Sequence, residues 1–174
     1  AMAAAGIAKP RTIAVVPGAY KPPHRGHMDM IKHYADKADE VVILISPKPR
    51  DGVTAQQSAE IWQRYIDSSG IPNVKIEVSQ GSPVKSAIEF GNRPEVAGSD
   101  IILGASTKPD AKGMADIIRF NRDMQQYSPN VNILDPMEHA YTPRDVGISA
   151  SDFRQAVQSD QPIQRFVPEL GADV

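Results

Sequence analysis

Five short apolar runs alternate with longer segments of helical periodicity, and this alternation constrains the fold more than any other feature of the chain. We expect strands at residues 12–17, 40–46, 74–79, 100–104 and 131–134. We expect helices at residues 27–38, 54–70, 83–90, 114–125 and 149–158, and one more helical turn or a docked tail at 161–170. Alternating strands and helices are typical of βαβ units around a parallel sheet. The predicted fold is therefore α/β, a Rossmann-like open parallel sheet of about five strands with helices on both faces.

The length and the composition of the chain favour one domain. The chain has 174 residues, of which 41% are hydrophobic and 23% charged, and these values are typical of a soluble globular protein. We expect a flexible N-terminal tail at residues 1–10 and a single domain at 11–174. No apolar run approaches the roughly 20 residues that span a bilayer, and the start of the chain lacks the regions of a signal peptide. A cytoplasmic protein without a membrane partner is the expectation.

Charge and cysteine content narrow the function classes. The formal net charge is −2, so there is no global positive field to hold long nucleic acid, and any anion must be held by local groups. The chain has no cysteine, which excludes disulfides, thiolate metal sites and a cysteine nucleophile. No G-x-G-x-x-G follows the first predicted strand, so the dinucleotide fingerprint of a dehydrogenase is missing.

The decapeptide "GAYKPPHRGH" follows the first predicted strand directly. Its prolines and glycines oppose regular structure, so it predicts a rigid loop that delivers His24 and His27 to the first turn of the next helix. Unpaired backbone N–H groups and the helix dipole make such a turn an anion site. Gly26 lets a phosphate approach the backbone, and we expect Lys21 and Arg25 to add charge at the rim.

Two other interpretations of this loop remain open from the residues alone. The prolines can simply stiffen a turn, with both histidines idle, or His24 and His27 can be two ligands of a metal ion. No third histidine or carboxylate has an obvious ligand spacing, so no protein-held metal is predicted. His33 is expected on the solvent side of its helix, and His139 in a loop.

The decapeptide matches the pattern Gly-x-aromatic-x-Pro-x-His-x-Gly-His. It resembles the signature of the HxGH nucleotidyltransferase superfamily, which includes the adenylyl- and cytidylyltransferases, with the closest likeness to archaeal-type nicotinamide mononucleotide adenylyltransferases. The resemblance implies that His24 and His27 are catalytic. It also implies that substrates are bound by Gly18, Tyr20, Lys21 and Gly26.

A second segment, "ISASDFR" at residues 148–154, matches the superfamily's Ile-Ser-x-(Ser/Thr)-x-x-Arg motif. Its residues also form a helix start, because Ser149 is a good N-cap and Asp152 would complete a capping box. Capping explains neither the second hydroxyl, Ser151, nor Arg154 one turn later. The resemblance implies that both serines bind the β- and γ-phosphates and that Arg154 is catalytic.

The loop "SPKPRDG" after the second predicted strand resembles the lysine-bearing loop of several superfamily members. We expect Lys48 or Arg50 to bind a substrate phosphate there, although an exposed basic turn explains the same residues. The same two interpretations, phosphate binding or an exposed basic turn, apply to Lys108 and Lys112. Many relatives carry an arginine where this chain has Ser58, which leaves the acceptor open.

The resemblance implies a nucleotidyltransferase that moves a nucleoside monophosphate from a triphosphate, ATP favoured over CTP, to a phosphate or hydroxyl of a small acceptor, releasing pyrophosphate. The acceptor would attack directly and in line, and Mg²⁺ would be bound mainly through the triphosphate. Nicotinamide mononucleotide is the acceptor favoured by family likeness. The alternative is a catalytically inactive nucleotide-binding module of the same fold.

Overall fold

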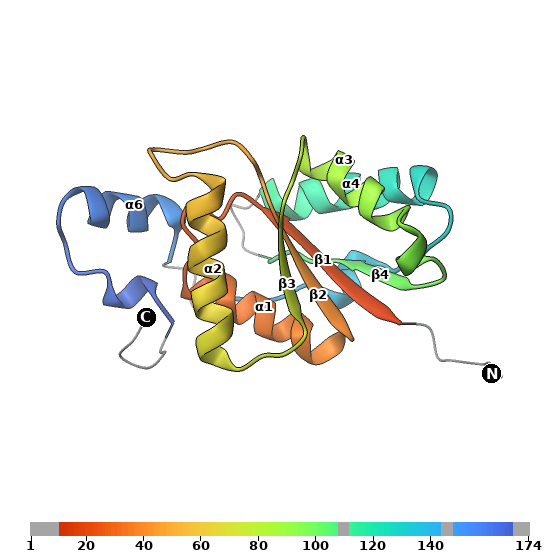
Figure 1. Ribbon diagram of the computed structural model, residues 1–174, viewed down its shortest axis with the longest axis horizontal. Helices are drawn as coiled ribbons and strands as arrows, with labels where there is room; N and C mark the ends of the chain where they lie inside the picture. The colour runs from red at the N-terminus through yellow and green to blue at the C-terminus, as the bar shows by residue number, and fades with distance from the viewer. Residues whose placement is uncertain (1–10, 108–111, 144–147, 169–174) are drawn as a thin grey trace.

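The computed structural model describes residues 11–107, 112–143 and 148–168, and these residues form a twisted parallel sheet with helices on both faces (Figure 1). The strands lie in the order β3-β2-β1-β4-β5. Their bounds are β1 Thr12–Gly18, β2 Glu40–Ile45, β3 Val74–Val78, β4 Asp100–Leu103 and β5 Asn132–Ile133. The predicted fold class is confirmed. The expected tail at 1–10 lies outside the described residues.

Each predicted helix is present, and two short ones were not predicted. The α-helices are α1 Arg25–Lys37, α2 Ala55–Ser69, α3 Pro83–Gly91, α4 Lys112–Tyr127, α5 Pro136–His139 and α6 Ala150–Gln158. The 3₁₀ turns are η1 Pro94–Val96 and η2 Gln164–Phe166. Both unpredicted turns, η1 and α5, begin at a proline, a residue favoured at the first helical position. No helix in the described part of the chain is long and apolar enough to cross a bilayer.

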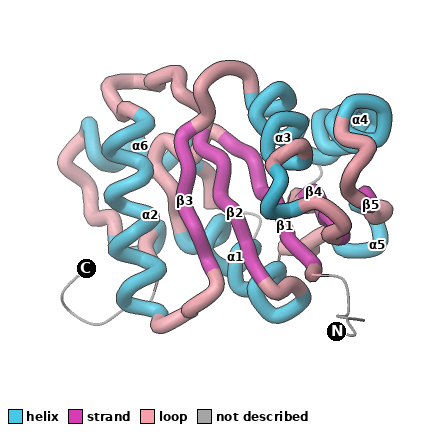
Figure 2. The backbone as a smooth tube through the Cα atoms, turned by 45° about the vertical axis from the view of Figure 1, so that its right-hand side comes forward, coloured by secondary structure: helices cyan, strands magenta, loops and turns pink. Residues whose placement is uncertain are grey.

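The sheet separates two apolar cores, because β1 and β2 are buried on both faces. On one face Ala14 and Val16 pack with α1 and α2, whereas on the other Ile13 and Val15 pack with α3 and α4. Figure 2 shows the strands between these two helix pairs. A strand that is buried on both faces has apolar residues at successive positions, and this explains why the sequence of β1 does not alternate between apolar and polar residues.

The chain order reverses beside β1, and this reversal positions the functional site. From β1 the chain first builds β2 and β3 on one side, and then crosses over to build β4 and β5 on the other. In open parallel sheets a crevice opens beyond the carboxyl ends of the strands at such a switch point. The loops after β1, β2 and β4 therefore meet at one edge.

Two histidine predictions differ from the structure. His33 is half-buried, not on the solvent side, and its Nε2 atom lies 2.8 Å from the carbonyl oxygen of His139. His139 belongs to the one-turn helix α5 rather than to a loop. The contact joins two segments 106 residues apart, and sequence periodicity along α1 does not reveal such a partner.

Gly104, just after β4, permits close packing of α1 on the sheet. A Cβ atom at this position would lie 2.8 Å from Tyr34 Cε2 and 2.8 Å from Val16 Cγ2. The Tyr34 hydroxyl accepts a hydrogen bond from Ala105 N (2.9 Å) and donates one to Ala105 O (3.0 Å). Both the ring and the hydroxyl of Tyr34 therefore depend on the absence of a side chain at 104.

We expect Gly104→Ala to destabilise the fold by about 1–3 kcal/mol, because the added methyl group overpacks a closed contact. For a chain of this size the melting temperature should fall by roughly 3 °C or more. Gly81→Ala is the matched control, since a Cβ atom there meets nothing within 4 Å. Equal melting temperatures of the two variants in a calorimetric scan would contradict this packing.

Candidate functional site

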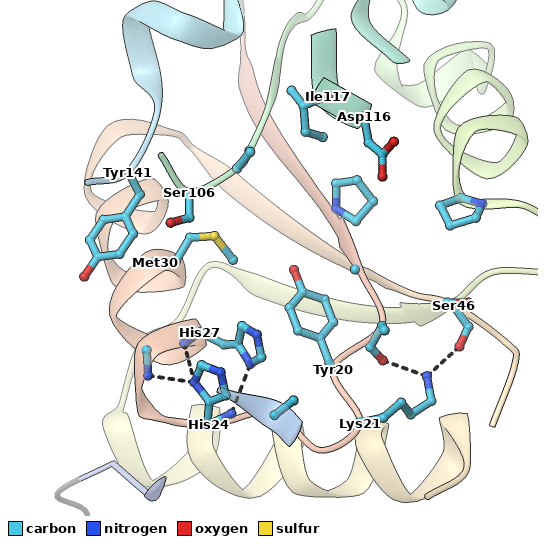
Figure 3. A pocket seen from close by; sticks show the side chains of 18 of the residues that line it. Tyr20, Lys21, His24, His27, Met30, Ser46, Ser106, Asp116, Ile117 and Tyr141 are labelled. Atoms are coloured by element: carbon cyan, nitrogen blue, oxygen red, sulfur yellow. Dashed lines mark hydrogen bonds between the residues drawn. The ribbon is translucent and has the colours of Figure 1, made fainter. Parts of the chain in front are cut away.

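A cavity of about 480 Å³ opens at the carboxyl ends of β1, β2 and β4 (Figure 3). The predicted site residues that line it are Gly18, Tyr20, Lys21, His24, Gly26, His27, Arg50 and Arg154. Ile148, the first residue of the second motif, lines it as well, and so do residues that sequence analysis did not single out, among them Met30, Ser46, Pro83, Ser106, Asp116, Ile117, Phe120 and Tyr141. Arg25, Lys48, Ser149 and Ser151 are not among the described residues that line it.

The two sequence motifs meet at this cavity. Arg154 Nη1 donates a hydrogen bond of 2.7 Å to the carbonyl oxygen of Lys21, across 133 residues of sequence. Both residues line the cavity. The loop around His24 and the helix start around residue 150 therefore share one cleft.

His24 and His27 form a capping box at the start of α1. His24 Nδ1 accepts from the backbone N–H groups of Gly26 (3.1 Å) and His27 (3.3 Å). In return His27 Nδ1 accepts from the backbone N–H of His24 at 3.1 Å. Imidazoles thus do the capping that a serine and a glutamate do in most such boxes.

This capping decides where the imidazole protons are. A nitrogen that accepts a hydrogen bond carries no proton, so in the neutral ring of each histidine the proton is on Nε2. The tautomer follows here from the bonding pattern of His24 and His27. The two rings stack at 3.6 Å and 17°, and the His27 ring meets the Tyr20 ring edge-on at 4.9 Å. The site therefore holds two stacked Nε2–H donors beside the cavity.

The capping also corrects the expectation of free backbone donors at this helix. Gly26 N and His27 N bond to His24 Nδ1, and Met28 N bonds to His24 O at 3.0 Å. These amides are therefore already bonded within the start of the helix and are not available to an anion. Gly26 makes room for the capping ring, because a Cβ atom there would lie 3.0 Å from His24 Cε1.

Helix α2 holds the loop before His24 by two side-chain donors. Ser58, fully buried, donates its hydroxyl to the carbonyl oxygen of Tyr20. Tyr65 donates to the carbonyl oxygen of Pro23 at 3.2 Å, and burial raises the pKa of Tyr65 to about 12, which keeps this donor protonated. The loop is mostly buried, so each carbonyl needs a partner inside the protein.

Lys21 is buried rather than placed at the rim, contrary to expectation. Its side chain is 1% exposed, and Nζ donates to Ala19 O (2.6 Å) and Ser46 O (2.8 Å). It ties the ends of β1 and β2 together and leaves its charge beside the cavity. Burial lowers the pKa of Lys21, and the nearby Arg50 lowers it further. The positive charges of Lys21 and Arg50 therefore lie close together at the edge of the cavity.

A tight turn presents Arg50 to the cavity. Arg50 and Val53 pair as an antiparallel bridge, and Asp51 (φ 50°) and Gly52 (φ 82°) form the turn between them. Positive φ at both central positions is the geometry of an Asp-Gly hairpin turn. Lys48 lies exposed outside the cavity, so of the two cations left open by the sequence Arg50 is the one that lines it.

Arg154 is held by three partners. Besides Lys21 O, its Nε bonds Asp51 Oδ2 at 2.8 Å and its Nη2 bonds Ser151 Oγ at 3.2 Å. Ser149 caps α6 by accepting from Asp152 N at 3.1 Å, without a reciprocal bond from Asp152 among the described residues. Both serines thus form hydrogen bonds within the protein, and their contacts with phosphate stay predictions.

The far wall of the cavity is the part that sequence analysis missed. Asp116, Ile117 and Phe120 come from α4, which the sequence predicted as a helix without assigning it to the site. No motif marks these residues, because they come from one turn of an ordinary amphipathic helix. Lys108 lies outside the described residues, as does the side chain of Lys112. Within the described ranges no group of three metal-ligating side chains occurs.

Comparison with known proteins shows the family and the fold of this chain. The family model described as cytidylyltransferase-like matches residues 15–156. The phosphopantetheine adenylyltransferase of Caldanaerobacter subterraneus is 23% identical over 92% of this chain and 93% of its own length. That of Clavibacter michiganensis is 25% identical over the same shares. That of Aquifex aeolicus is 35% identical, over 37% of this chain and 40% of its own.

A solved structure shares the fold at low sequence identity. It is a provisionally named nicotinate-nucleotide adenylyltransferase from Vibrio parahaemolyticus, with a TM-score of 0.62 and 17% identity, covering 90% of this chain and 93% of that one. The superfamily resemblance read from the two motifs is confirmed. The finer likeness to archaeal-type nicotinamide mononucleotide adenylyltransferases stays a prediction.

We expect Ser58→Ala to lower the free energy of unfolding by about 1–3 kcal/mol, because it leaves the buried carbonyl of Tyr20 without a donor. Ser68→Ala, an exposed serine on the same helix, is the control and should change stability by less than about 0.5 kcal/mol. Urea unfolding followed by the fluorescence of Trp62, the single tryptophan, measures both. A Ser58→Ala chain as stable as the control would show that the loop does not need this bond.

Proposed function

The chain belongs to the cytidylyltransferase-like family and is a nucleotidyltransferase, and on this basis we propose that it transfers an adenylyl group from ATP to the phosphate of a small phosphomonoester. The observation that carries the proposal is the pair of Nε2–H donors of His24 and His27 at a cavity shared with Arg154. The names of the relatives support adenylyl transfer. Both acceptors in those names, phosphopantetheine and nicotinate nucleotide, carry a phosphate.

The proposed chemistry is a direct in-line displacement. An oxygen of the acceptor phosphate forms a bond to the α-phosphorus of ATP, the bond from that phosphorus to the α–β bridging oxygen breaks, and pyrophosphate leaves with the electron pair. The protein then needs no covalent nucleophile, only positioning and stabilisation of charge. Nε2–H donors that are fixed by a helix cap are preorganised for this task, because they need not turn as charge develops.

The cations of the cavity suit the remaining phosphates. Lys21 and Arg50 lie near each other at the carboxyl end of β2, and the guanidinium of Arg50 has no hydrogen-bond or ion-pair partner within the described residues. Two neighbouring cations repel one another until an anion lies between them. We assign the acceptor phosphate to this pair. Arg154, on the side of α6, then faces the triphosphate.

Magnesium fits this scheme as part of the substrate. Mg²⁺ keeps much of its water shell and binds mainly through phosphate oxygens in such sites. Asp116 is the only carboxylate side chain among the described lining residues, so the wall offers no cage for a resident ion. The ion, entering with ATP, neutralises charge on the phosphates that the protein positions.

Conservative substitutions separate the catalytic role of the histidines from their capping role. His24→Asn keeps an acceptor for the amides of α1 but lacks the Nε2–H donor, and His27→Gln does the same for the reciprocal bond. We expect either variant to remain folded while the rate of pyrophosphate release falls about 10²–10³-fold. His24→Ala, which loses the cap as well, should also lose about 1 kcal/mol of stability.

The measurement is pyrophosphate release with ATP, with CTP, and with a panel of phosphomonoesters, beside thermal unfolding of each variant. Undiminished turnover in His24→Asn and His27→Gln would refute the roles given to the imidazoles. Tight ATP binding without turnover on any acceptor would instead favour a binding module.

A charge-matched pair tests the acceptor phosphate site. Arg50→Gln removes a cation that lines the cavity, whereas Lys48→Gln removes one two residues away that does not. We expect Arg50→Gln to raise the KM for the acceptor about ten-fold or more, the value of a charge-assisted hydrogen bond. Lys48→Gln should leave the KM close to that of the unaltered chain. Equal effects of the two changes would mean that only general charge matters.

A further inference from the structure

The cavity has electrically different ends. In Figure 3 His24 and His27 lie at the lower left and Lys21 at the lower right, whereas Asp116 and Ile117 lie at the top, on the other side of the Tyr20 ring. The first end is cationic or donates hydrogen bonds. The second end is apolar except for a carboxylate, and no other carboxylate lines the cavity among the described residues.

The carboxylate of Asp116 lies on the second turn of α4. The next residue, Ile117, and Phe120 one turn later are 3% and 8% exposed and also line the cavity. Asp116 Oδ1 forms an ion pair of 3.0 Å with Arg119 Nη2. The Arg119 and Asp116 side chains are 56% and 43% exposed, so solvent screens both charges, but only Asp116 is among the described residues that line the cavity.

In the arrangement proposed here, an acceptor that reacts at its phosphate extends toward this wall. In the proposed reaction the acceptor phosphate lies beside the imidazoles and the cationic pair, because in-line attack requires contact with the α-phosphorus there. The remainder of the acceptor then lies along the apolar side chains of Ile117 and Phe120. Its far end meets the carboxylate of Asp116.

We propose that Asp116 is a specificity-determining residue that favours acceptors with an uncharged, hydrogen-bond-donating tail and rejects acceptors whose tail ends in a carboxylate. The inference rests on the proposed function. A tail amide or hydroxyl donates to the Asp116 oxygens, whereas a tail carboxylate meets a partly screened like charge there and gives up part of its hydration beside the apolar side chains. Specificity of this kind uses repulsion of the wrong partner as much as attraction of the right one.

The proposal distinguishes the two acceptor chemistries named in the comparisons. Phosphopantetheine joins its phosphate to a neutral tail with hydroxyl and amide donors, whereas nicotinate nucleotide ends in a ring carboxylate. The Asp116 wall suits the first and opposes the second. The shared fold of the Vibrio parahaemolyticus protein therefore does not extend to a shared acceptor.

The test uses two acceptors that differ only in this group. Nicotinamide mononucleotide carries an amide where nicotinate mononucleotide carries a carboxylate. With ATP and Mg²⁺, we expect kcat/KM of the unaltered chain to favour the amide at least about five-fold, the order of magnitude of one partly screened like-charge contact. Asp116→Asn should bring the two values close to parity, chiefly by improving the carboxylate acceptor.

Two further variants control for changes in folding and in net charge. Arg119→Gln removes the partner of Asp116 and keeps the carboxylate, so it should widen the preference for the amide. Asp123→Asn removes a carboxylate of the same helix that is paired to Arg122 at 3.7 Å and does not line the cavity. It should leave the preference as it is in the unaltered chain.

A binding measurement keeps this inference separate from the proposed reaction. Trp62 lies 6.4 Å from the His27 ring, between ring centroids, so its fluorescence reports occupancy of the site. Phosphopantetheine and both mononucleotides are titrated in the presence of a non-hydrolysable ATP analogue. The same order of affinity without turnover would reject the transfer reaction and retain the role of Asp116. Equal affinities for the two mononucleotides, no binding of either, or an order unaltered in Asp116→Asn would overturn it.

Discussion

The site depends on how the buried loop between β1 and α1 pairs its carbonyl groups. Backbone carbonyls that cannot reach water need donors inside the protein. The oxygens of residues 18–21 and 23 accept from Ser46 N, Lys21 Nζ, Ser58 Oγ, Arg154 Nη1 and the Tyr65 hydroxyl. These donors come from the loop itself, the end of β2, α2 and α6. The position of His24 is therefore set by most of the structure on this side of the sheet.

This bonding gives the motif residues structural roles beside the chemical roles that we propose for them. Arg154 orients the loop through Lys21 O while its guanidinium lines the cavity, and His24 caps α1 while it presents a donor. Removing either residue by alanine changes the loop and the chemistry together. Substitutions that retain one role are needed to assign the other, because residues that share a bonding network do not contribute independently.

The asymmetry of the cavity follows from the same topology. The loops after β1 and β2 bring histidine, lysine and arginine to one end, whereas α4 reaches the other end from the opposite layer of the sheet. In the proposed reaction the phosphates meet beside these cations and donors, whose charge is most effective close to the reacting centre. The opposite wall carries the carboxylate of Asp116, to which we assign a preference among acceptors.

Local sequence patterns predicted much of the fold and those site residues that belong to the two motifs. The apolar runs of β1, β2 and β4 and the spacing of His24 and His27 each signal their structure within a few residues, because strand burial and helix capping are local properties. The burial of Lys21, the partner of Ser58 and the choice of Arg50 over Lys48 were not predictable in this way. Each of these features depends on contact with a segment far away in the sequence, and a local sequence pattern does not predict such a contact.

The amino-acid sequence by itself thus determined the layered α/β fold, the superfamily and the histidine pair. Only the tertiary structure decided that the first amides of α1 bond to His24 while both imidazoles line the cavity, and that a carboxylate from α4 lies at the far wall. The physical reason is that propensity and capping act between near neighbours. The field inside a cavity is the sum over side chains from five or more separate segments.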